Sequence, residues 1–251
     1  MGIHGGRRLV TAVVAVALAA AAVSGCGGRA TARDGKDAYA GVGDLPEKLA
    51  ADGTTIVVGD PEAPVTLALY EDPRCPVCKE FESADGGGPA ARDAMLRHGL
   101  RTEYTMASFL DEKLGGHGSQ KAVNALRAAL EEGKFAEYHE VLYRHQPEES
   151  VDGFTDARLL QLASKVDGLR GPAFDSAVRT MKYRDFVAES EQAYDQAGDA
   201  TEPRGPGTPT AVINGTRIPV AYSGLLYDRQ RFDLLLTQIE QDPESWADWR
   251  F

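Results

Sequence analysis

The sequence is poor in cysteine, in basic charge and in long apolar runs. It holds 3 cysteines in 251 residues, and 27 lysine and arginine residues face 38 aspartate and glutamate residues. The net charge of -11 argues against nucleic-acid binding and against docking on anionic lipid by charge. There is no second cysteine pair and no H-E-x-x-H segment, so a four-ligand zinc site lacks candidates. A phosphate-binding loop, a dinucleotide fingerprint and an internal repeat are also absent.

The N-terminal segment reads as an export signal. An apolar run over residues 9–23 follows Arg7 and Arg8, which is the order of a signal peptide. The run is shorter than the ~20 residues that a membrane-spanning helix needs. It ends in Val23-Ser24-Gly25-Cys26, which resembles the lipobox of bacterial lipoproteins, where the cysteine is lipidated. An ordinary cleaved signal with a chance cysteine is the alternative.

We therefore expect a signal peptide over 1–25, a lipidated Cys26 and a glycine-rich flexible tether over 26–52. Stable anchoring takes more than one acyl chain. The expected location is the outer face of the cytoplasmic membrane, a compartment that tolerates disulfides.

Residues 53–251 have the length of one domain with its own core. Alternation and β-branched runs predict strands, and apolar residues at helical spacing predict a helical block over 119–198. Two short strands around Asn214-Gly215 predict a hairpin, followed by a helix that includes Phe232 and Leu235. The tail holds Trp246 and Trp249, which we expect on the surface. The expected strands cover residues 54–58, 65–70, 100–106, 210–213 and 216–220.

The segment Cys75-Pro76-Val77-Cys78 carries the clearest chemistry. It directly follows the expected strand over 65–70 and begins a helical stretch at Pro76. Two cysteines three positions apart at a helix start lie on one side, within reach of a disulfide. The unpaired N–H groups of the first turn favour an anion, so Cys75 is expected to ionise and act as the nucleophile. Cys78 is then the buried resolving cysteine.

Three features together resemble the DsbA-like thiol–disulfide oxidoreductases of the thioredoxin superfamily. They are the run over 70–78, the segment Gly207-Thr208-Pro209-Thr210 before the hairpin, and the helical block between them. The resemblance implies an α/β thioredoxin fold with a helical insertion at about 118–200, between the active-site half and the hairpin. It implies a cis Pro209 facing the dithiol, with the Thr208 backbone free to pair with a client peptide.

The same resemblance implies the partners. These are client proteins with thiols or disulfides and a membrane redox partner; the redox-active disulfide Cys75–Cys78 is the only cofactor, and no metal is required. We expect a monomer. The sequence leaves open whether the protein oxidises or reduces its clients.

The sequence departs from the family pattern in two places. Many thioredoxin-fold enzymes hold a buried acid six positions before the first cysteine, where this chain has Leu69. Glu71 or Asp72 could move protons near Cys78, although capping and solvent-facing turn polarity are the more ordinary role for both. Val77 carries no charge and no side-chain donor, so we predict a less oxidising couple than in relatives with histidine there.

Two other functions stay open at this stage. A metallochaperone would hold Cu(I) between Cys75 and Cys78, soft ligands for a soft ion, with Met106 or His117 as a further ligand. An interaction module on a thioredoxin scaffold is less compatible with an intact dithiol. The scattered histidines are expected to be structural or surface residues: His98, His117, His139 and His145.

Overall fold

The computed structural model describes residues 1–2, 36–243 and 246. Cys26, residues 3–25 of the expected signal peptide and residues 26–35 of the expected tether lie outside these ranges. Among the residues that are described, we find no helix with the length and apolar character that a membrane crossing requires.

A six-stranded mixed sheet forms the centre of the described chain. Its order is β1-β2-β4-β3-β5-β6, in which β3 and β4 run parallel and the other neighbours run antiparallel. A parallel pair needs a helical crossover between its strands, and α1 and α2 provide it here. The strands are β1 (Glu47–Leu49), β2 (Ile56–Gly59), β3 (Val65–Glu71), β4 (Leu100–Met106), β5 (Thr210–Ile213) and β6 (Thr216–Arg217).

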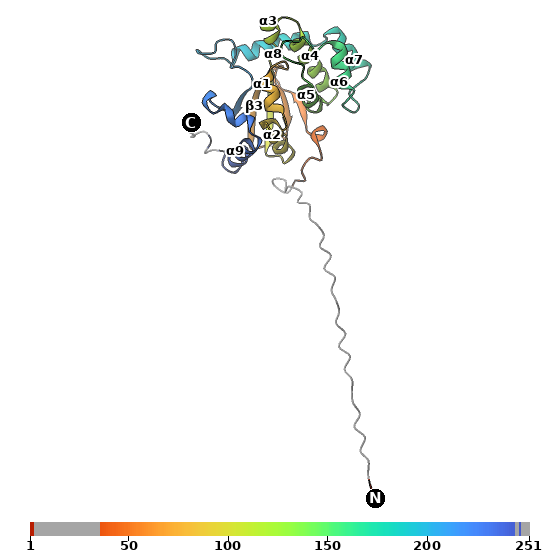
Figure 1. The fold of residues 1–251 in the computed structure, drawn as a ribbon, viewed down its shortest axis with the longest axis vertical. Helices are drawn as coiled ribbons and strands as arrows, with labels where there is room; N and C mark the ends of the chain where they lie inside the picture. Colours follow the sequence, from red (N-terminus) through yellow and green to blue (C-terminus); the bar gives the residue numbers. More distant parts are fainter. Residues whose placement is uncertain (3–35, 244–245, 247–251) are drawn as a thin grey trace.

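Helices cover the sheet and form the insertion (Figure 1). Helices α2 and α9 pack on each other in the lower part of the domain in the view of Figure 1, where α2 also packs on β4 and β2; α8 packs on β4 as well. The insertion of α3 to α8 lies between β4 and β5 and gathers at the top and right of that view. The helices are α1 (Pro76–Glu82), α2 (Gly87–Leu96), α3 (Leu110–Leu114), α4 (Gly118–Glu131), α5 (Phe135–Arg144), α6 (Asp156–Ala163), α7 (Pro172–Thr180), α8 (Arg184–Gln196) and α9 (Arg229–Gln241), with short 3-10 turns η2 (Val42–Asp44) and η3 (Val220–Tyr227).

This architecture is the predicted thioredoxin fold with a helical insertion. The insertion begins earlier than expected, because α3 starts at Leu110 directly after β4. The hairpin forms around Asn214 and Gly215, both at positive φ, although β6 is only two residues long and η3 follows it. The Asn214 side chain also accepts from the Thr66 backbone N–H at 2.8 Å, which ties the turn to β3.

The expected flexible tether is wrong for its second half. Strand β1 pairs with β2, and Leu45 is buried in the core. Lys36 makes ion pairs of 3.0 Å with Asp60 and 3.1 Å with Glu62. Glu47 accepts the first backbone N–H groups of α5, so this segment also fastens the insertion. These contacts join residues far apart in sequence, which local composition does not reveal.

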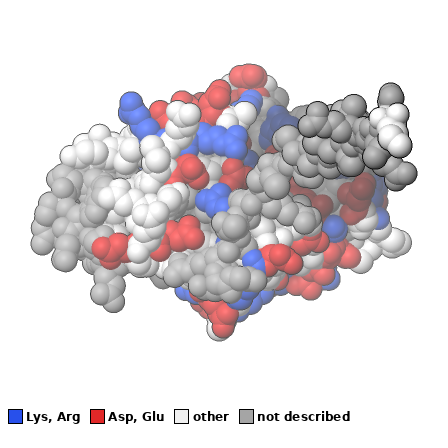
Figure 2. Space-filling view, turned by 90° about the horizontal axis from the view of Figure 1, so that it is seen from below, with Lys and Arg blue, Asp and Glu red and all other residues white. Residues whose placement is uncertain are grey.

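The tail prediction also needs correction. Trp246 is fully buried, and its Nε1 donates to the Ile213 carbonyl oxygen at 2.6 Å. The indole therefore covers the end of β5 instead of lying on the surface; Trp249 lies outside the described residues. On the surface, acidic and basic side chains are interspersed over the face in Figure 2, so the net acidity forms no single patch on that face.

Candidate active site

The two cysteines sit at the first turn of α1. Cys75 is the N-cap residue with extended backbone, and Pro76 is the first helical residue, where its missing N–H is not needed. Both sulfurs are free thiols; Cys75 is 6% exposed and Cys78 is 0% exposed. The intervening Val77 is 38% exposed. A partner molecule can thus reach the dipeptide and the rim of Cys75, but not Cys78.

The surroundings shift the pKa values of the two thiols in opposite directions. The neighbouring Cys78 thiol lowers the pKa of Cys75 to about 6, against the opposing effect of burial. The Thr208 side chain and the backbone N–H groups of Val77 and Cys78 lower it further. Burial raises the pKa of Cys78 well above its usual range, and the neighbouring Cys75 adds to that. At neutral pH, Cys75 is a thiolate nucleophile and Cys78 is a neutral thiol.

The segment just before β5 places Thr208 against Cys75. The Thr208–Pro209 peptide bond is cis, as expected from the resemblance. As a thiol, Cys75 donates from Sγ to the Thr208 carbonyl oxygen at 3.3 Å. A thiolate has no proton to donate there. The Thr208 hydroxyl has no hydrogen-bond partner among the described residues, and it is the group of Thr208 that can donate to the thiolate.

The helical insertion holds the loop before α1. Gln146, just after α5, donates from its amide to the carbonyl oxygens of Pro73 at 2.8 Å and Cys75 at 2.9 Å. Arg74 is buried, and its guanidinium donates to Asp111 at 2.8 Å and to the Gly115 carbonyl oxygen at 2.9 Å. The cysteine-bearing loop is therefore fixed from the insertion side.

Asp72 is a buried linking residue, and the expectation of a solvent-facing role is wrong for it. Its carboxylate accepts from the backbone N–H groups of Arg74 at 2.9 Å and Leu110 at 3.0 Å, and from the Ser119 hydroxyl at 2.6 Å. Burial raises the pKa of Asp72 to about 7, although these hydrogen bonds oppose it. The capping part of the expectation is correct, and the bonds join the active-site loop to α3 and α4.

Glu71 is also fully buried, so the solvent-facing expectation is wrong here too. A hydrogen bond of 2.9 Å joins its Oε2 to His139 Nε2 on α5. Burial raises the pKa of Glu71 to about 7, and the His139 hydrogen bond offsets only part of this. Burial acts to lower the pKa of His139, but the hydrogen bond and the charge of Glu71 outweigh it, so the net shift is upward. The pair therefore holds a proton near neutral pH.

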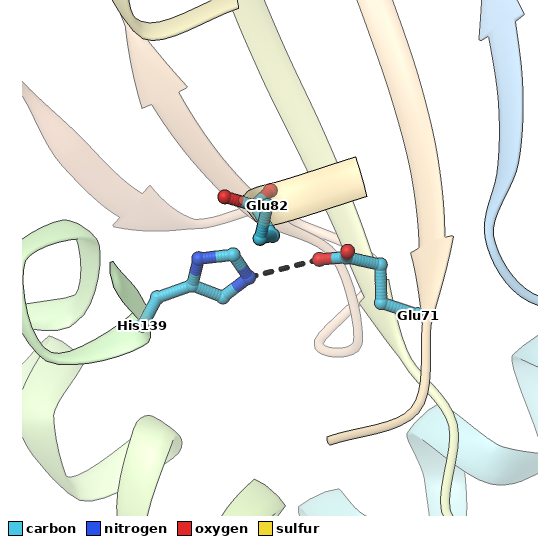
Figure 3. Close-up of side chains that lie close together, drawn as sticks. All are labelled: Glu71, Glu82 and His139. Atoms are coloured by element: carbon cyan, nitrogen blue, oxygen red, sulfur yellow. Dashed lines mark hydrogen bonds and ion pairs between the residues drawn. The ribbon is translucent and has the colours of Figure 1, made fainter. Parts of the chain in front are cut away.

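Glu82 completes a cluster with this pair (Figure 3). Glu71, Glu82 and His139 each offer one ligand atom, and these atoms lie within 4.8 Å of one another. Arg92 Nη1 lies 2.5 Å from Glu82 Oε2, and Glu71 Oε2 is bonded to His139. Each carboxylate thus already has a partner side chain, Arg92 for Glu82 and His139 for Glu71. This arrangement fits a hydrogen-bonded cluster better than a cation site.

The site combines a dithiol at the start of α1, a cis proline before β5 and a mixed sheet. Known protein families can be compared with this combination. A family model described as thioredoxin matches residues 51–231. The chain belongs to the thioredoxin family.

Solved structures agree with this thioredoxin-family fold. BdbD from Bacillus subtilis covers 82% of the chain and 100% of its own length, with 20% identity and a TM-score of 0.60. MdbA, a thiol-disulfide oxidoreductase from Corynebacterium diphtheriae, covers 80% of this chain and 95% of its own, with 17% identity and a TM-score of 0.58. Reduced DsbA from Mycobacterium tuberculosis covers 78% and 98%, with 22% identity and a TM-score of 0.54. The fold is therefore DsbA-like.

Curated sequence relatives are longer proteins. A Na(+)/H(+) antiporter, NhaA 3 of Salinispora tropica, is 31% identical over 165 residues, which is 64% of this chain and 22% of the antiporter. NhaA 1 of Salinispora arenicola is 30% identical over 174 residues, or 66% of this chain and 22% of that protein. The chain thus spans less than a quarter of the length of these relatives.

Sequence reasoning found the dithiol and the hairpin of this thioredoxin-family protein but missed the cluster. Val65, Leu67, Leu69 and Glu71 alternate along β3, and all four are buried. This period of two, continued one step past Leu69, places Glu71 on the core face. His139 lies four residues after buried Phe135 on α5, and Glu82 lies four after Cys78 on α1.

The remaining candidates have simpler surroundings. His98 is buried against Asp60, with 2.8 Å between Nδ1 and Oδ2, whereas His117 is exposed before α4. Met106 is buried at the end of β4. The group of three potential His, Cys, Asp or Glu ligands found among the described residues includes neither cysteine. The Cu(I) alternative stays a prediction, and no contact specifically favours it.

Proposed function

We propose that this protein is an extracytoplasmic thiol–disulfide oxidoreductase that exchanges disulfides with client proteins through Cys75 and Cys78. The observation that carries the proposal is that the two thiols differ in ionisation and in exposure. One is ionised at the helix mouth beside Thr208, and the other is sealed and neutral behind it. Disulfide exchange needs an accessible thiolate of this kind and a resolving partner within reach.

The oxidising direction starts from the Cys75–Cys78 disulfide. A client thiolate attacks Cys75 Sγ, the disulfide bond breaks, and its electron pair goes to Cys78, which takes up a proton. A second client thiolate then attacks the client sulfur of the mixed disulfide and releases Cys75 as a thiolate. The low pKa of Cys75 makes it the better leaving group in this last step. The reducing direction is the reverse sequence.

The client is expected to lie along Thr208 and the exposed Val77. The Thr208 backbone borders Cys75, and an extended peptide there can pair with it as an added strand. No cofactor beyond the dithiol is needed, and a membrane redox partner, quinone-linked in the oxidising direction, restores the starting state. We place the protein at the outer face of the cytoplasmic membrane, held by a lipid on Cys26 and acting as a monomer.

The test is exchange with a reduced, unfolded client by the oxidised full-length protein. Cys75→Ser is expected to abolish exchange. Cys78→Ser, given a client that already carries a disulfide, is expected to accumulate the mixed disulfide at Cys75, visible on a non-reducing gel. Cys26→Ser is the matched control; it should retain exchange and lose membrane association. If Cys75→Ser exchanges as well as the wild type, the proposal fails. Stoichiometric Cu(I) binding without exchange would favour the metallochaperone instead.

The direction follows from the reduction potential of the Cys75–Cys78 couple. Equilibration with a thiol buffer of known potential measures it. A value well above about -270 mV would indicate an oxidase, and a value near it a reductase.

A further inference from the structure

Cys78 has to gain or lose a proton in each cycle of the proposed function, on which this inference rests. It is 0% exposed, and its pKa lies well above the usual range. A client lying across Val77 and Thr208 covers the side of Cys75 that reaches the surface. The proton therefore needs a path that does not pass the client.

Glu71 is placed to exchange that proton. It lies at the end of β3 just before the active-site loop, and its charge acts on the Cys78 sulfur. Its Oε2 is bonded to His139, whereas Oε1 is buried and has no partner among the described residues. A carboxyl group with one oxygen held and the other free can take up or release a proton without rearranging its neighbours.

Aromatic side chains fix the imidazole that holds Glu71. The ring centroids of Tyr104, Phe135 and Tyr143 lie 4.9, 5.5 and 4.8 Å from that of His139. Such packing keeps the ring in one orientation and leaves Nε2 directed at Glu71, as Figure 3 shows. Tyr143 also belongs to the buried apolar cluster that contains both cysteines, so it is shared between the surroundings of the dithiol and those of the imidazole.

Glu82 connects the cluster to solvent. It lies one turn after Cys78 on α1, and Gly88 makes room for its carboxylate, since a Cβ there would lie 2.6 Å from Glu82 Oε2. Glu82 lines a cavity of about 550 Å³ between α1, α2 and α5, here called the α1–α2–α5 cavity. Its lining includes Lys79, Glu82, Arg92, Glu140, Tyr143 and Arg144. Within the described residues, the lining includes none of the four that frame Cys75, which are Pro76, Val77, Thr208 and Pro209.

We propose that Glu71, His139 and Glu82 pass protons between Cys78 and the α1–α2–α5 cavity while a client covers Cys75. When the Cys75–Cys78 bond breaks, its electron pair goes to Cys78 Sγ, and the proton held by Glu71 and His139 moves to that sulfur. Glu82 and water in the cavity replace it. In the opposite step Cys78 gives its proton to Glu71 and attacks the mixed disulfide at Cys75. Histidine from the insertion thereby acts as a positioning and relay residue for the dithiol.

The charges around the cluster are compatible with a transferable proton. Burial raises the pKa of Glu71 to about 7, which matches the pH at which exchange has to run. Arg92 on α2 forms an ion pair with Glu82, so the charge of the guanidinium balances that of this carboxylate. The titratable and charged groups that face Glu71 and His139 are Cys75, Cys78, Glu82, Arg92, Tyr104 and Tyr143.

The experiment is single-turnover reduction of the oxidised full-length protein by excess dithiothreitol from pH 5 to 9, because this probe needs no client. The rate per dithiothreitol thiolate should fall above pH about 7 in the wild type. Glu71→Gln should lower the rate below pH 7 by about 100-fold and remove the inflection. His139→Gln, which can still bond Glu71 but cannot relay a proton, should also remove it. Glu82→Gln, which can still accept from Arg92, is tested in a second assay, in which Cys78 attacks the mixed disulfide between Cys75 and a bulky client. The substitution should slow the release of that client.

Glu140→Gln is the matched control, since Glu140 lines the same cavity on α5 outside the cluster. It should keep the wild-type profile. In every variant, thiolate absorbance should still show the Cys75 titration near pH 6, which separates lost proton transfer from a damaged fold. Retention of the wild-type rate and inflection in folded Glu71→Gln or His139→Gln overturns the route. If Glu71→Gln does not fold, Glu82→Gln with the Glu140→Gln control decides. Absence of client exchange with this pH profile intact would refute only the proposed function.

Discussion

Gln146 and Cys75 are joined by a hydrogen bond from the Gln146 side-chain amide to the Cys75 carbonyl oxygen, 2.9 Å long. The same amide nitrogen donates to the Pro73 carbonyl oxygen at 2.8 Å. The donor comes from just after α5, and the acceptors flank the nucleophile. The buried Pro73 carbonyl oxygen precedes the helix and needs such a partner, whereas the Cys75 carbonyl oxygen also accepts from the Lys79 backbone N–H of α1 at 3.1 Å. The insertion is therefore part of the active-site structure.

Gln146→Ala should destabilise the protein by about 2 kcal/mol, because it leaves the buried Pro73 carbonyl oxygen without its donor and removes one of the two hydrogen bonds to the Cys75 carbonyl oxygen. It should also loosen the loop before α1, so that the reactivity of Cys75 becomes less uniform. Urea unfolding at pH 7 measures the free energy. The matched control is Gln161→Ala on the exposed face of α6, with an expected change of about 0.5 kcal/mol or less. Equal effects of the two substitutions would show that the amide bonds contribute nothing.

Thr208→Val should raise the pKa of Cys75 above its value of about 6. The substitution removes the hydroxyl that can donate to the thiolate and retains the backbone carbonyl that accepts from the thiol. Absorbance of the thiolate at 240 nm, followed from pH 4 to 9, gives the pKa directly. Thr216→Val on β6 is the control and should leave the titration in place. An unchanged pKa in Thr208→Val would mean that the Thr208 hydroxyl does not bond the sulfur.

Val77→His should lower the pKa of Cys75 and make the couple more oxidising. Val77 is 38% exposed between the cysteines, so an imidazole fits there without repacking the core. A charged or hydrogen-bonding ring stabilises the thiolate, and thus the reduced form, by an amount that Val77 cannot supply. The reduction potential should rise by about 30 mV or more, which corresponds to roughly 1.4 kcal/mol. A potential equal to that of the wild type would contradict the assigned effect of the dipeptide.

The parts of the fold and site that local sequence encodes were predictable. The dithiol, the helix start at Pro76 and the hairpin at Asn214 each depend on a few adjacent residues. Pro209 could be placed opposite the sulfurs only through the family resemblance. The burial of Glu71 could have been predicted as well, because the alternation along β3 puts its position on the core face.

The remaining features depend on contacts across the chain. Glu47 caps α5 from a segment whose composition indicates a loop, and Trp246 is buried by a bond to Ile213. Neither partner can be chosen from the local pattern, since each bond joins residues more than 30 positions apart. The same is true of His139 and Glu71, which are 68 positions apart. Long-range polar pairing, not helix or strand propensity, is what the sequence does not reveal.

The stability of the reduced protein should rise with pH relative to that of the oxidised protein. The folded pKa of Cys75, about 6, lies below the value of about 8.5 expected for an unfolded cysteine. A group with a depressed folded pKa contributes stability that is fully present above the unfolded pKa and is lost as pH falls through the folded one. The contribution should therefore grow between pH about 6 and about 8.5, reaching about 3 kcal/mol.

Glu71 and Asp72 have raised pKa values and act in the opposite sense, losing stability as pH rises toward about 7. They are present in both redox forms, so the difference between the forms removes most of their effect and leaves the thiol titrations. Urea unfolding of both forms at pH 5.5, 7 and 8.5 measures that difference. Cys75→Ser has no disulfide and forms no thiolate at the helix mouth, so the reduced wild type should also gain stability with pH relative to this variant. A difference that stays constant with pH in the wild type would mean that Cys75 is not preferentially ionised in the folded protein.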